Sequence, residues 1–470
     1  MTRGRVAVHA HFYQPLRADP FSGVIPVDPT ATPYHDWNAR IDAESYKPNA
    51  ARGNLERISW DLGPTLAGWL AAEDPSTHLR FVEAAPGRAM AQPYHHSILP
   101  LASAADRRTE IRWGIRDSEL RFGFRPNGVW LPETAVDLPT LALLAEEGIA
   151  YTILAPWQAA DAQIDTRRPY RVSIGSGQAI SVAFYDAALS SAVSFEPTAT
   201  DDADRFALER IAPRLARPPF PDGTTPTALI ATDGELYGHH HVFRELFLEH
   251  LHVPTPADAQ ARTYDTVLLS EVMVEPADQP FAVARILERT SWSCHHGVAR
   301  WSAECPDATD GRWKGPLRAA LDRLAAGIDA VSLGLLKASG VGLDFWAARD
   351  AYIEVVSGAE DRNSFARRQL GARVARNDER QLIELLEAQR WRLAMFASDG
   401  WYWEDPARQE TAQNLLAAAR AVRIVDSLAD TRLEESLAAD LALFSSPSRG
   451  LDGAVLYRMA LESIGQPGPE

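Results

Sequence analysis

Two histidines stand at the end of the first β-type apolar run of the chain. The run Arg5–Ala10 passes directly into the motif His9–Pro15, with the sequence HAHFYQP. Because alternate residues of a strand share a face, we expect His9 and His11 to point the same way. Two buried, hydrogen-bonded histidines are the structural alternative. Since Gln14 joins them at the strand end, the pattern favours a site instead.

A glutamate follows a second apolar run. Gly128–Glu133 (GVWLPE) leads through Trp130 into a turn that contains proline and ends on Glu133. Most glutamates are solvated surface charges. Because Glu133 comes so soon after an apolar run, we expect it at a barrel mouth among aromatic side chains. A carboxylate in that position can act as a nucleophile.

An aspartate follows the strand run Ala228–Thr232. The motif Thr232–His239 (TDGELYGH) places Asp233 directly after this run, and Glu235 fits a supporting role beside it. A loop aspartate that caps a helix is the common alternative. Three consecutive histidines begin at His239, and because their side chains diverge we expect at most one of them to be functional.

A fourth cluster, Ser291–Gly297 (SWSCHHG), combines Trp292 with a cysteine and two histidines. Cys294, His295 and His296, together with Cys305, could supply zinc ligands. Adjacent Cys-His-His is not a usual zinc spacing, however, and the chain has no CxxC pair. We therefore predict no metal and no cofactor, and interpret this segment as a sugar-contacting loop or a buried corner.

Two carboxylates after two strands, with histidines and tryptophans around them, form the constellation of a glycosidase. One carboxylate attacks the anomeric carbon, and the other is held protonated and gives its proton to the leaving oxygen. Tryptophan faces stack on sugar rings, and tryptophan slightly outnumbers tyrosine, 13 to 12. The chemistry requires no metal.

The elements that must position these residues alternate between short strands and helices over the first 300 residues. The apolar runs are typical of parallel strands buried on both faces. The expected strands are Arg5–Ala10, Leu79–Glu83, Gly128–Leu131, Ala150–Leu154, Ile180–Phe184 and Ala228–Thr232. Helical spacing is found at Asn54–Leu70 and Leu138–Glu147, and after Trp301 at Lys314–Ala326, Leu343–Val356, Glu379–Ser398 and Thr411–Leu428. The pattern predicts a parallel sheet or barrel followed by a helical domain.

The composition excludes several classes of protein. The 470 residues carry a formal net charge of −16, the wrong sign for nucleic acid or an anionic membrane. Two cysteines are too few for a disulfide scaffold and fit a reducing compartment. We see neither a signal-type apolar segment nor a run of about 18 apolar residues, so we predict a soluble cytoplasmic protein. Only residues 465–470 are expected to be disordered.

The motifs resemble those of glycoside hydrolase family 57, which includes α-amylases, 4-α-glucanotransferases, amylopullulanases and glycogen branching enzymes. His9–Pro15 resembles the first motif of the family, Gly128–Glu133 the motif with the nucleophile, and Asp233–His239 the motif with the acid/base. The resemblance implies Glu133 as nucleophile, Asp233 as acid/base, a (β/α)7 barrel, a retaining mechanism and α-glucan substrates. The first motif departs from the amylase pattern by an inserted Phe12-Tyr13, which bears on reaction specificity.

The match is closest to a less characterised subgroup with a C-terminal helical domain of undefined function, similar to Leu385–Trp401 here. Further motifs of the subgroup are Tyr34–Asn38, Gly63–Leu66, Gln92–His96 and Ser291–Gly297. We expect residues 1–300 to form the (β/α)7 barrel of the glycoside hydrolase/deacetylase type and residues 301–470 an α-helical domain packing on its mouth. The predicted substrate-binding residues are His9, His11, Gln14, Trp37, His96, Trp130, His239, Trp292, His296, Trp401 and Trp403.

The sequence thus predicts a retaining enzyme that cleaves α-1,4-glucan or transfers its glycosyl units. A metal-dependent carbohydrate deacetylase is one alternative, but it needs an Asp with a His-x-x-x-His pair, and the chain has no histidines four apart. A non-catalytic glucan-binding protein on the same fold is the other. The expected partner is an α-glucan, with no nucleic acid and no membrane, and the oligomeric state stays open.

Overall fold

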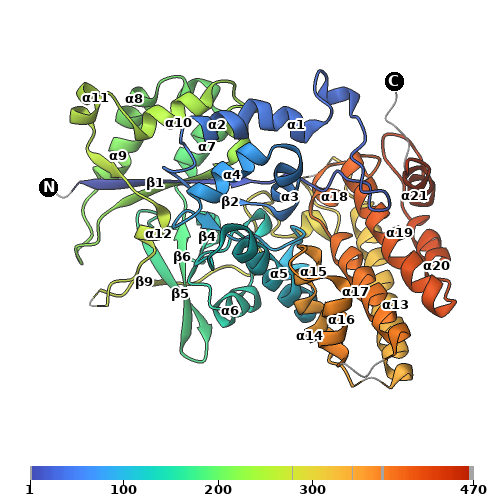
Figure 1. Cartoon of the computed structure of the whole chain (residues 1–470). Helices are drawn as coiled ribbons and strands as arrows, with labels where there is room; N and C mark the ends of the chain where they lie inside the picture. Colours follow the sequence, from blue (N-terminus) through green and yellow to red (C-terminus); the bar gives the residue numbers. More distant parts are fainter. Residues whose placement is uncertain (1–2, 278, 308, 341, 372–374, 465–470) are drawn as a thin grey trace. The chain divides into compact units, whose positions relative to one another are not determined.

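The structure is a computed structural model that describes residues 3–464 except 278, 308, 341 and 372–374, so the predicted disordered tail lies outside the described residues. The chain divides into two compact units. The first, which we call the barrel unit, comprises Met1–Gln14, Thr30–Gln92 and Arg121–Ser293. The second, the helical unit, comprises Pro15–Pro29, Pro93–Leu120 and Cys294–Glu470. Figure 1 colours the chain from blue to red along its length.

Strand β1 (Gly4–Phe12) is the centre of the barrel unit. It pairs in parallel with β2 (Ser59–Leu62) on one side and with β7 (Thr227–Asp233) on the other, and β2 continues to β3 (Ala89–Met90). The short β8 (Tyr264–Thr266) joins the amino-terminal end of β1. In this register His11 lies opposite Asp61 on β2 and opposite Asp233 on β7. Three polar residues therefore form a row at the carboxyl ends of the strands.

A second sheet completes the ring of parallel segments. Strand β4 (Tyr151–Leu154) pairs in parallel with β6 (Gln178–Phe184), which forms a hairpin with β5 (Pro169–Gly175), and β5 pairs with β9 (Ala282–Ala284). Isolated parallel bridges join Val129 to Ala91, after β3, and Gly128 to Tyr151 on β4. The Asp186 N–H, after β6, donates to Leu229 O on β7 at 2.8 Å. The order is that of a seven-stranded α/β barrel without a regular ladder between β6 and β7, and the predicted fold class is confirmed.

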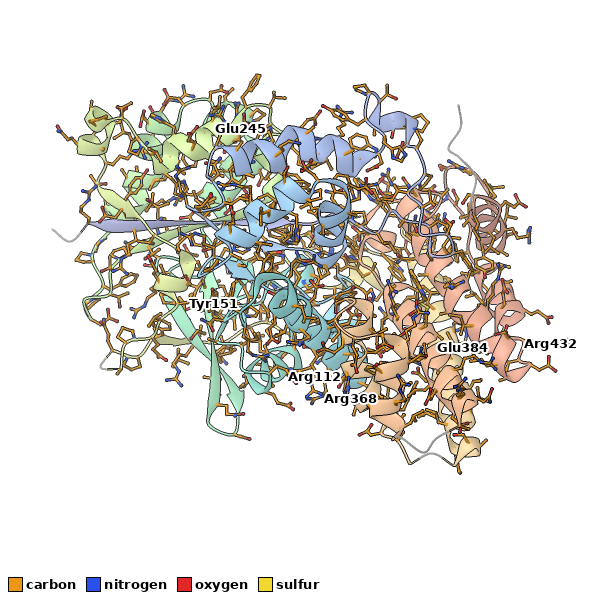
Figure 2. The ribbon with its side chains drawn as sticks, in the orientation of Figure 1. Arg112, Tyr151, Glu245, Arg368, Glu384 and Arg432 are labelled. Atoms are coloured by element: carbon orange, nitrogen blue, oxygen red, sulfur yellow. The ribbon has the colours of Figure 1, made fainter. Side chains whose placement is uncertain are left out.

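The strands bury both faces, as the apolar runs predicted. On β1, Val6, Val8, Ala10 and Phe12 belong to a core cluster that includes helix residues, whereas Ala7 belongs to a second cluster with residues of β3, β4, β6 and β7. Tyr151, labelled in Figure 2, belongs to this second cluster. The helices of the unit are α1 (Trp37–Ile41), α2 (Lys47–Ala51), α3 (Pro64–Glu73), α4 (Pro75–Ala84), α6 (Leu138–Glu146), α7 (Ala187–Phe195), α8 (Ala203–Phe206), α9 (Ala212–Leu215), α10 (Arg244–His252), α11 (Pro256–Ala261) and α12 (Leu269–Val272).

The helical unit contains the helices predicted after Trp301. They are α13 (Lys314–Ser339), α14 (Phe345–Ala351), α15 (Ile353–Val356), α16 (Arg362–Leu370), α17 (Arg376–Ala394), α18 (Asp399–Tyr402), α19 (Gln409–Ala429), α20 (Leu433–Leu441) and α21 (Gly453–Glu462), with most of α5 (Ala104–Phe122). An apolar stripe of α17, including Leu382 and Leu386, packs in a core cluster with Trp113 of α5. No described helix is long and apolar enough to cross a membrane.

Two of the predicted elements are wrong. The predicted strand Leu79–Glu83 lies inside helix α4, because Pro75 opens that helix and Asp74 caps it by accepting from the Ser76 and Thr77 N–H groups. The predicted helix Asn54–Leu70 contains strand β2, and its helical part begins only at Pro64. In contrast, α6 begins and ends within one residue of its prediction.

Candidate active site

Asp61 joins the two histidines of the first motif. It is fully buried on β2, and its carboxylate contacts His9 Nε2 and His11 Nδ1, each at 2.8 Å. The Gln92 side-chain amide also donates to it. All four side chains are buried. The Asp61 carboxylate therefore provides the hydrogen-bond partners that the polar side chains of β1 and of the segment after β3 need inside the barrel.

Aromatic rings support these histidines from one side. Trp130 is fully buried and stacks on His9 and on His11, with ring centroids 5.0 Å apart in both cases. Trp292 meets Trp130 edge-on at 5.0 Å and Tyr185 at 6.4 Å. Trp130 therefore supports the two imidazole rings from inside the barrel. Trp292 is only partly buried, so part of its indole is exposed to solvent.

Glu133 is held in an unusual backbone conformation. It has φ 55° and Thr134 has φ 48°, a left-handed pair that non-glycine residues rarely adopt. The Glu133 carboxylate accepts from Trp292 Nε1 at 2.9 Å and from Ser293 Oγ at 2.5 Å, both on Oε2. The Trp292 N–H also donates to the Glu133 carbonyl at 3.0 Å. The segment Trp292-Ser293 thus fixes both the main chain and the side chain of Glu133.

Asp233 ends β7 directly beside His11. The next residue must be glycine, because a Cβ on Gly234 would overlap the ring of Phe12. The Asp233 side chain is accessible to solvent, but the protein around it removes much of its hydration. This desolvation, together with the charges of Glu133 and Asp61, raises the pKa of Asp233 to about 6, against the opposing effect of His11.

Two further groups complete the electrostatics of the site. Burial lowers the pKa of His11, but the negative charges of Asp61, Asp233 and Glu235 outweigh burial and raise it to about 9. Burial raises the pKa of Glu235 to about 7, although Tyr46 Oη donates to its carboxylate at 2.6 Å. His11 is therefore a cation at neutral pH, surrounded by acids that differ in their readiness to ionise.

Three other predicted residues of the barrel unit lie on neighbouring segments. The Gln14 carbonyl accepts from Thr65 Oγ1 at 2.5 Å, and the side chain is buried. Trp37 opens α1 and meets His239 edge-on at 5.9 Å. His239 Nδ1 contacts the Glu44 carboxylate at 2.5 Å. Trp37 and His239 thus form a pair on the loops that follow β1 and β7.

Four predicted residues belong to the helical unit. His96 is buried, and its Nδ1 contacts Ser398 Oγ at 2.7 Å. Trp401 is 1% exposed and stacks on Phe396, so as a sugar platform it would need a rearrangement. Trp403 is 43% exposed, with the Arg408 guanidinium over its ring. His296 lies beside two cysteines and an aspartate.

The sequence interpretation missed four residues of the barrel site: Asp61, Gln92, Tyr46 and Ser293. Asp61 lay inside a segment interpreted as a helix, although the sequence Ser59–Leu62 is followed by Gly63-Pro64, which marks a break. Gln92 and Ser293 stood in motifs of the subgroup without an assigned role. Tyr46 offered no sequence signal, because its contact with Glu235 spans 189 residues.

A parallel α/β barrel with two carboxylates, two histidines and tryptophans at its strand ends is the arrangement of a glycoside hydrolase. Residues 81–282 match the profile of glycosyl hydrolase family 57, and residues 310–464 match a domain of unknown function, DUF3536. The profile match over residues 81–282 confirms the predicted resemblance to glycosyl hydrolase family 57, and the chain is an enzyme of the glycoside hydrolase class. No curated protein matches it.

Solved structures share the fold at low sequence identity. An exo-type maltose-forming amylase from Pyrococcus sp. ST04 is 14% identical, with a TM-score of 0.75 over 94% of this chain and 83% of that one. A branching enzyme from Pyrococcus horikoshii is 14% identical, with a TM-score of 0.58 over 100% and 98%. A 4-α-glucanotransferase from Thermococcus litoralis is 16% identical, with a TM-score of 0.54 over 89% and 60%.

Proposed function

We propose that the chain is a retaining enzyme acting on α-glucans, with Glu133 as the nucleophile and Asp233 as the general acid/base. The observation that carries this proposal is the difference between the two carboxyl groups. Two donors orient Oε2 of Glu133, which leaves Oε1 to attack. The pKa of Asp233, raised to about 6, allows it to hold a proton at mildly acidic pH.

The reaction proceeds in two displacements. Glu133 Oε1 bonds to the anomeric carbon while the glycosidic C–O bond breaks, and Asp233 gives its proton to the leaving oxygen. A hydroxyl of water or of another sugar then bonds to the same carbon. Asp233 takes its proton, and the bond to Glu133 breaks. Each displacement inverts the anomeric carbon, so the product keeps the α configuration.

The surrounding groups suit a neutral sugar. The His11 imidazolium can donate to a hydroxyl or to the negative charge of Asp233 after proton transfer. Trp292 offers a partly exposed indole, and Trp37 another. The solved structures with the same fold are, by their names, a maltose-forming amylase, a glucanotransferase and a branching enzyme, which favours an α-glucan as the substrate.

The test is incubation of the full chain with amylose and with maltoheptaose, followed by chromatography of the products. We expect shorter maltooligosaccharides if water is the acceptor, and both shorter and longer chains if a sugar is. NMR of the first product should show the α anomer. A folded protein that changes neither substrate would refute the proposal, and binding without turnover would indicate a non-catalytic glucan-binding protein.

Matched variants test the two roles. Glu133→Gln should lower kcat on the order of 10³-fold or more, and Asp233→Asn roughly 10²–10⁴-fold. The Asp233→Asn defect in kcat/KM should be much smaller on a nitrophenyl α-maltoside, because that leaving group departs without a proton in the first displacement. The exposed residues Glu209 and Asp265 provide controls, Glu209→Gln and Asp265→Asn, since Asp265 lies beside Arg5 at the opposite end of β1. Full activity in Glu133→Gln would contradict its role.

A further inference from the structure

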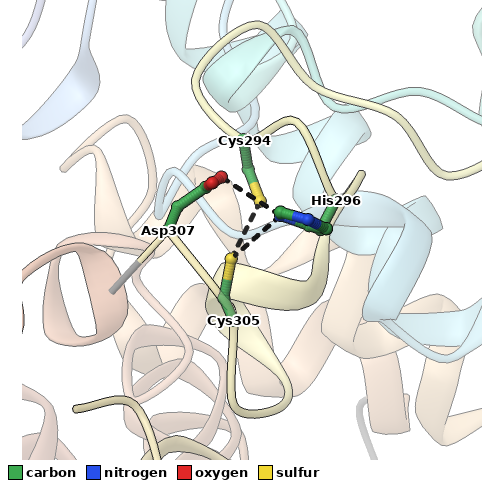
Figure 3. A group of neighbouring side chains, drawn as sticks. All are labelled: Cys294, His296, Cys305 and Asp307. Carbon is green, nitrogen blue, oxygen red and sulfur yellow. Dashed lines mark hydrogen bonds and ion pairs between the residues drawn. The ribbon is translucent and has the colours of Figure 1, made fainter. Parts of the chain in front are cut away.

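Four side chains that bind metals converge in the loop before α13. Cys294, His296, Cys305 and Asp307 each offer one ligand atom, and these four atoms all lie within 4.8 Å of one another. Figure 3 shows the two cysteines, the imidazole and the carboxylate directed toward a common centre. All four belong to the helical unit, and none has a role in the proposed reaction. The group therefore needs an explanation of its own.

Three of the six distances between the ligand atoms belong to direct contacts, and these three match a tetrahedral zinc site. Sγ of Cys294 and Sγ of Cys305 are 3.5 Å apart, Cys305 Sγ and His296 Nδ1 3.7 Å, and His296 Nδ1 and Asp307 Oδ2 3.3 Å. Zinc bonds of ~2.3 Å to sulfur and ~2.0 Å to nitrogen or oxygen separate tetrahedral ligands by ~3.8 Å for two sulfurs, ~3.5 Å for sulfur and nitrogen and ~3.3 Å for nitrogen and oxygen. The three edges agree with these values within about 0.3 Å.

Hydrogen bonds donated by main-chain N–H groups of the loop help to hold these residues. A turn follows the first pair, in which Gly297, at φ 76°, donates its N–H to the Cys294 carbonyl at 3.1 Å. The His295 N–H donates to Asp307 at 3.3 Å. Each half of the set is a pair two residues apart, Cys294 with His296 and Cys305 with Asp307. The sequence interpretation considered His295 instead of Asp307, which made the spacing look unsuitable.

A buried lysine lies near the two cysteines. Lys314 is 0% exposed, and its Nζ has no hydrogen-bond partner among the described residues. The charged or ionisable groups that act on it are Cys305, Cys294, Glu404 and the cation Arg300. Two thiolates, one carboxylate and a divalent ion carry a net charge of −1, so Lys314 would neutralise the occupied site.

We propose that Cys294, His296, Cys305 and Asp307 form a structural zinc site. Two sulfurs, one nitrogen and one oxygen within 4.8 Å of one another favour zinc over magnesium or calcium, which prefer six or more oxygens. Four protein ligands leave no open position for water, so the ion would stabilise the loop rather than take part in catalysis.

The site would also fix one end of the active-site segment. Cys294 directly follows Ser293, and Ser293 and Trp292 are the donors to Glu133. Metal removal should therefore reduce turnover as well as stability. This consequence rests on the proposed function, whereas the metal site itself does not.

The direct test is the metal content of the full chain, purified with reductant and dialysed against zinc. We expect about one zinc ion per chain. Cobalt in place of zinc should give the visible bands of a tetrahedral ion and a thiolate charge-transfer band. Cys305→Ser and His296→Ala should abolish stoichiometric binding, and the milder Asp307→Asn should weaken it at least about tenfold. His295→Ala is the matched control, since this neighbouring exposed histidine lies outside the group.

Circular dichroism of each variant separates loss of the site from loss of the fold. The proposal is overturned if the folded, reduced protein takes up no zinc, or if Asp307→Asn and His296→Ala bind zinc as the unchanged chain does. The proposal is also overturned if Cys294 and Cys305 form a disulfide and the protein takes up no metal after that disulfide has been reduced. Zinc binding in a chain without glucan activity would support the site and refute only the proposed function.

Discussion

Replacing Trp292 with phenylalanine tests how Glu133, the proposed nucleophile, is held. The indole Nε1 donates to Glu133 Oε2 at 2.9 Å, and the indole ring packs edge-on against Trp130. Phenylalanine keeps an aromatic ring there but removes the donor. The main-chain bond from residue 292 to the Glu133 carbonyl does not depend on the side chain, so the loop should keep its path.

The size of the effect follows from the kind of bond. A hydrogen bond to a charged group contributes about 1.5–3 kcal/mol, and 1.4 kcal/mol corresponds to a factor of ten. Because Ser293 Oγ still donates to the same oxygen, we expect the lower end for Trp292→Phe, a loss of about tenfold in kcat. The double variant with Ser293→Ala should lose about 100-fold or more.

The assay is initial-rate kinetics on maltoheptaose, with thermal unfolding measured in parallel. The matched control is Trp157→Phe, because the Trp157 Nε1 donates at 3.0 Å to the Ser291 carbonyl of the same segment and has no described bond to Glu133. This control should keep kcat within a few-fold. The reasoning would be refuted if the double variant had an unchanged kcat, or if only its KM changed.

Three further predictions follow from the charges. The kcat/KM of the enzyme should fall as pH rises through about 6, because Asp233 must be protonated to act as an acid; a profile flat from pH 5 to 8 would contradict this. Glu235 has a raised pKa of about 7, so its contribution to stability is full below its ordinary value and is lost as pH rises through 7. Glu235→Gln, which keeps an acceptor for Tyr46, should therefore raise the free energy of unfolding at pH 8 on the order of 2 kcal/mol and leave it nearly unchanged at pH 4; destabilisation at pH 8 would count against it. In the helical unit, Asp106 accepts at 2.8 Å from both Arg349 and Arg392, so Asp106→Asn should lower the free energy of unfolding in urea by about 3–5 kcal/mol, and a change below about 1 kcal/mol would be inconsistent.

The strand-end residues could be predicted because their signal is local. His11 and Asp233 follow or end runs whose apolar side chains are buried on both faces, and β1 and β7 form where those runs lie. Glu133 follows the run that pairs through Gly128 and Val129. A buried parallel strand is visible in sequence as an uninterrupted apolar run, and its carboxyl end is where sites form.

Asp61 could not be found in this way, because its strand is short and polar residues interrupt it. β2 has four residues, and helix-favouring residues surround it, so helical spacing outweighed the break at Gly63. The burial of Trp401 could not be predicted for a related reason. Trp401 lies just after the predicted helix Glu379–Ser398, but its side chain is buried, and its Nε1 donates to the distant Lys314 carbonyl at 3.4 Å. Spacing along the chain carries no information about such contacts.

The alternation along β1 shows why the row of Asp61, His11 and Asp233 is nonetheless specified by the sequence. Val6, Val8, Ala10 and Phe12 face a core cluster, and His9 and His11 face the interior of the barrel. A slip of β1 by one residue against its neighbours would turn both histidines into the apolar cluster, away from the carboxylate of Asp61. The register that places His11 between the two aspartates is therefore fixed by the apolar residues of the opposite face. Those residues take no part in the chemistry, yet they determine which groups set the pKa of Asp233.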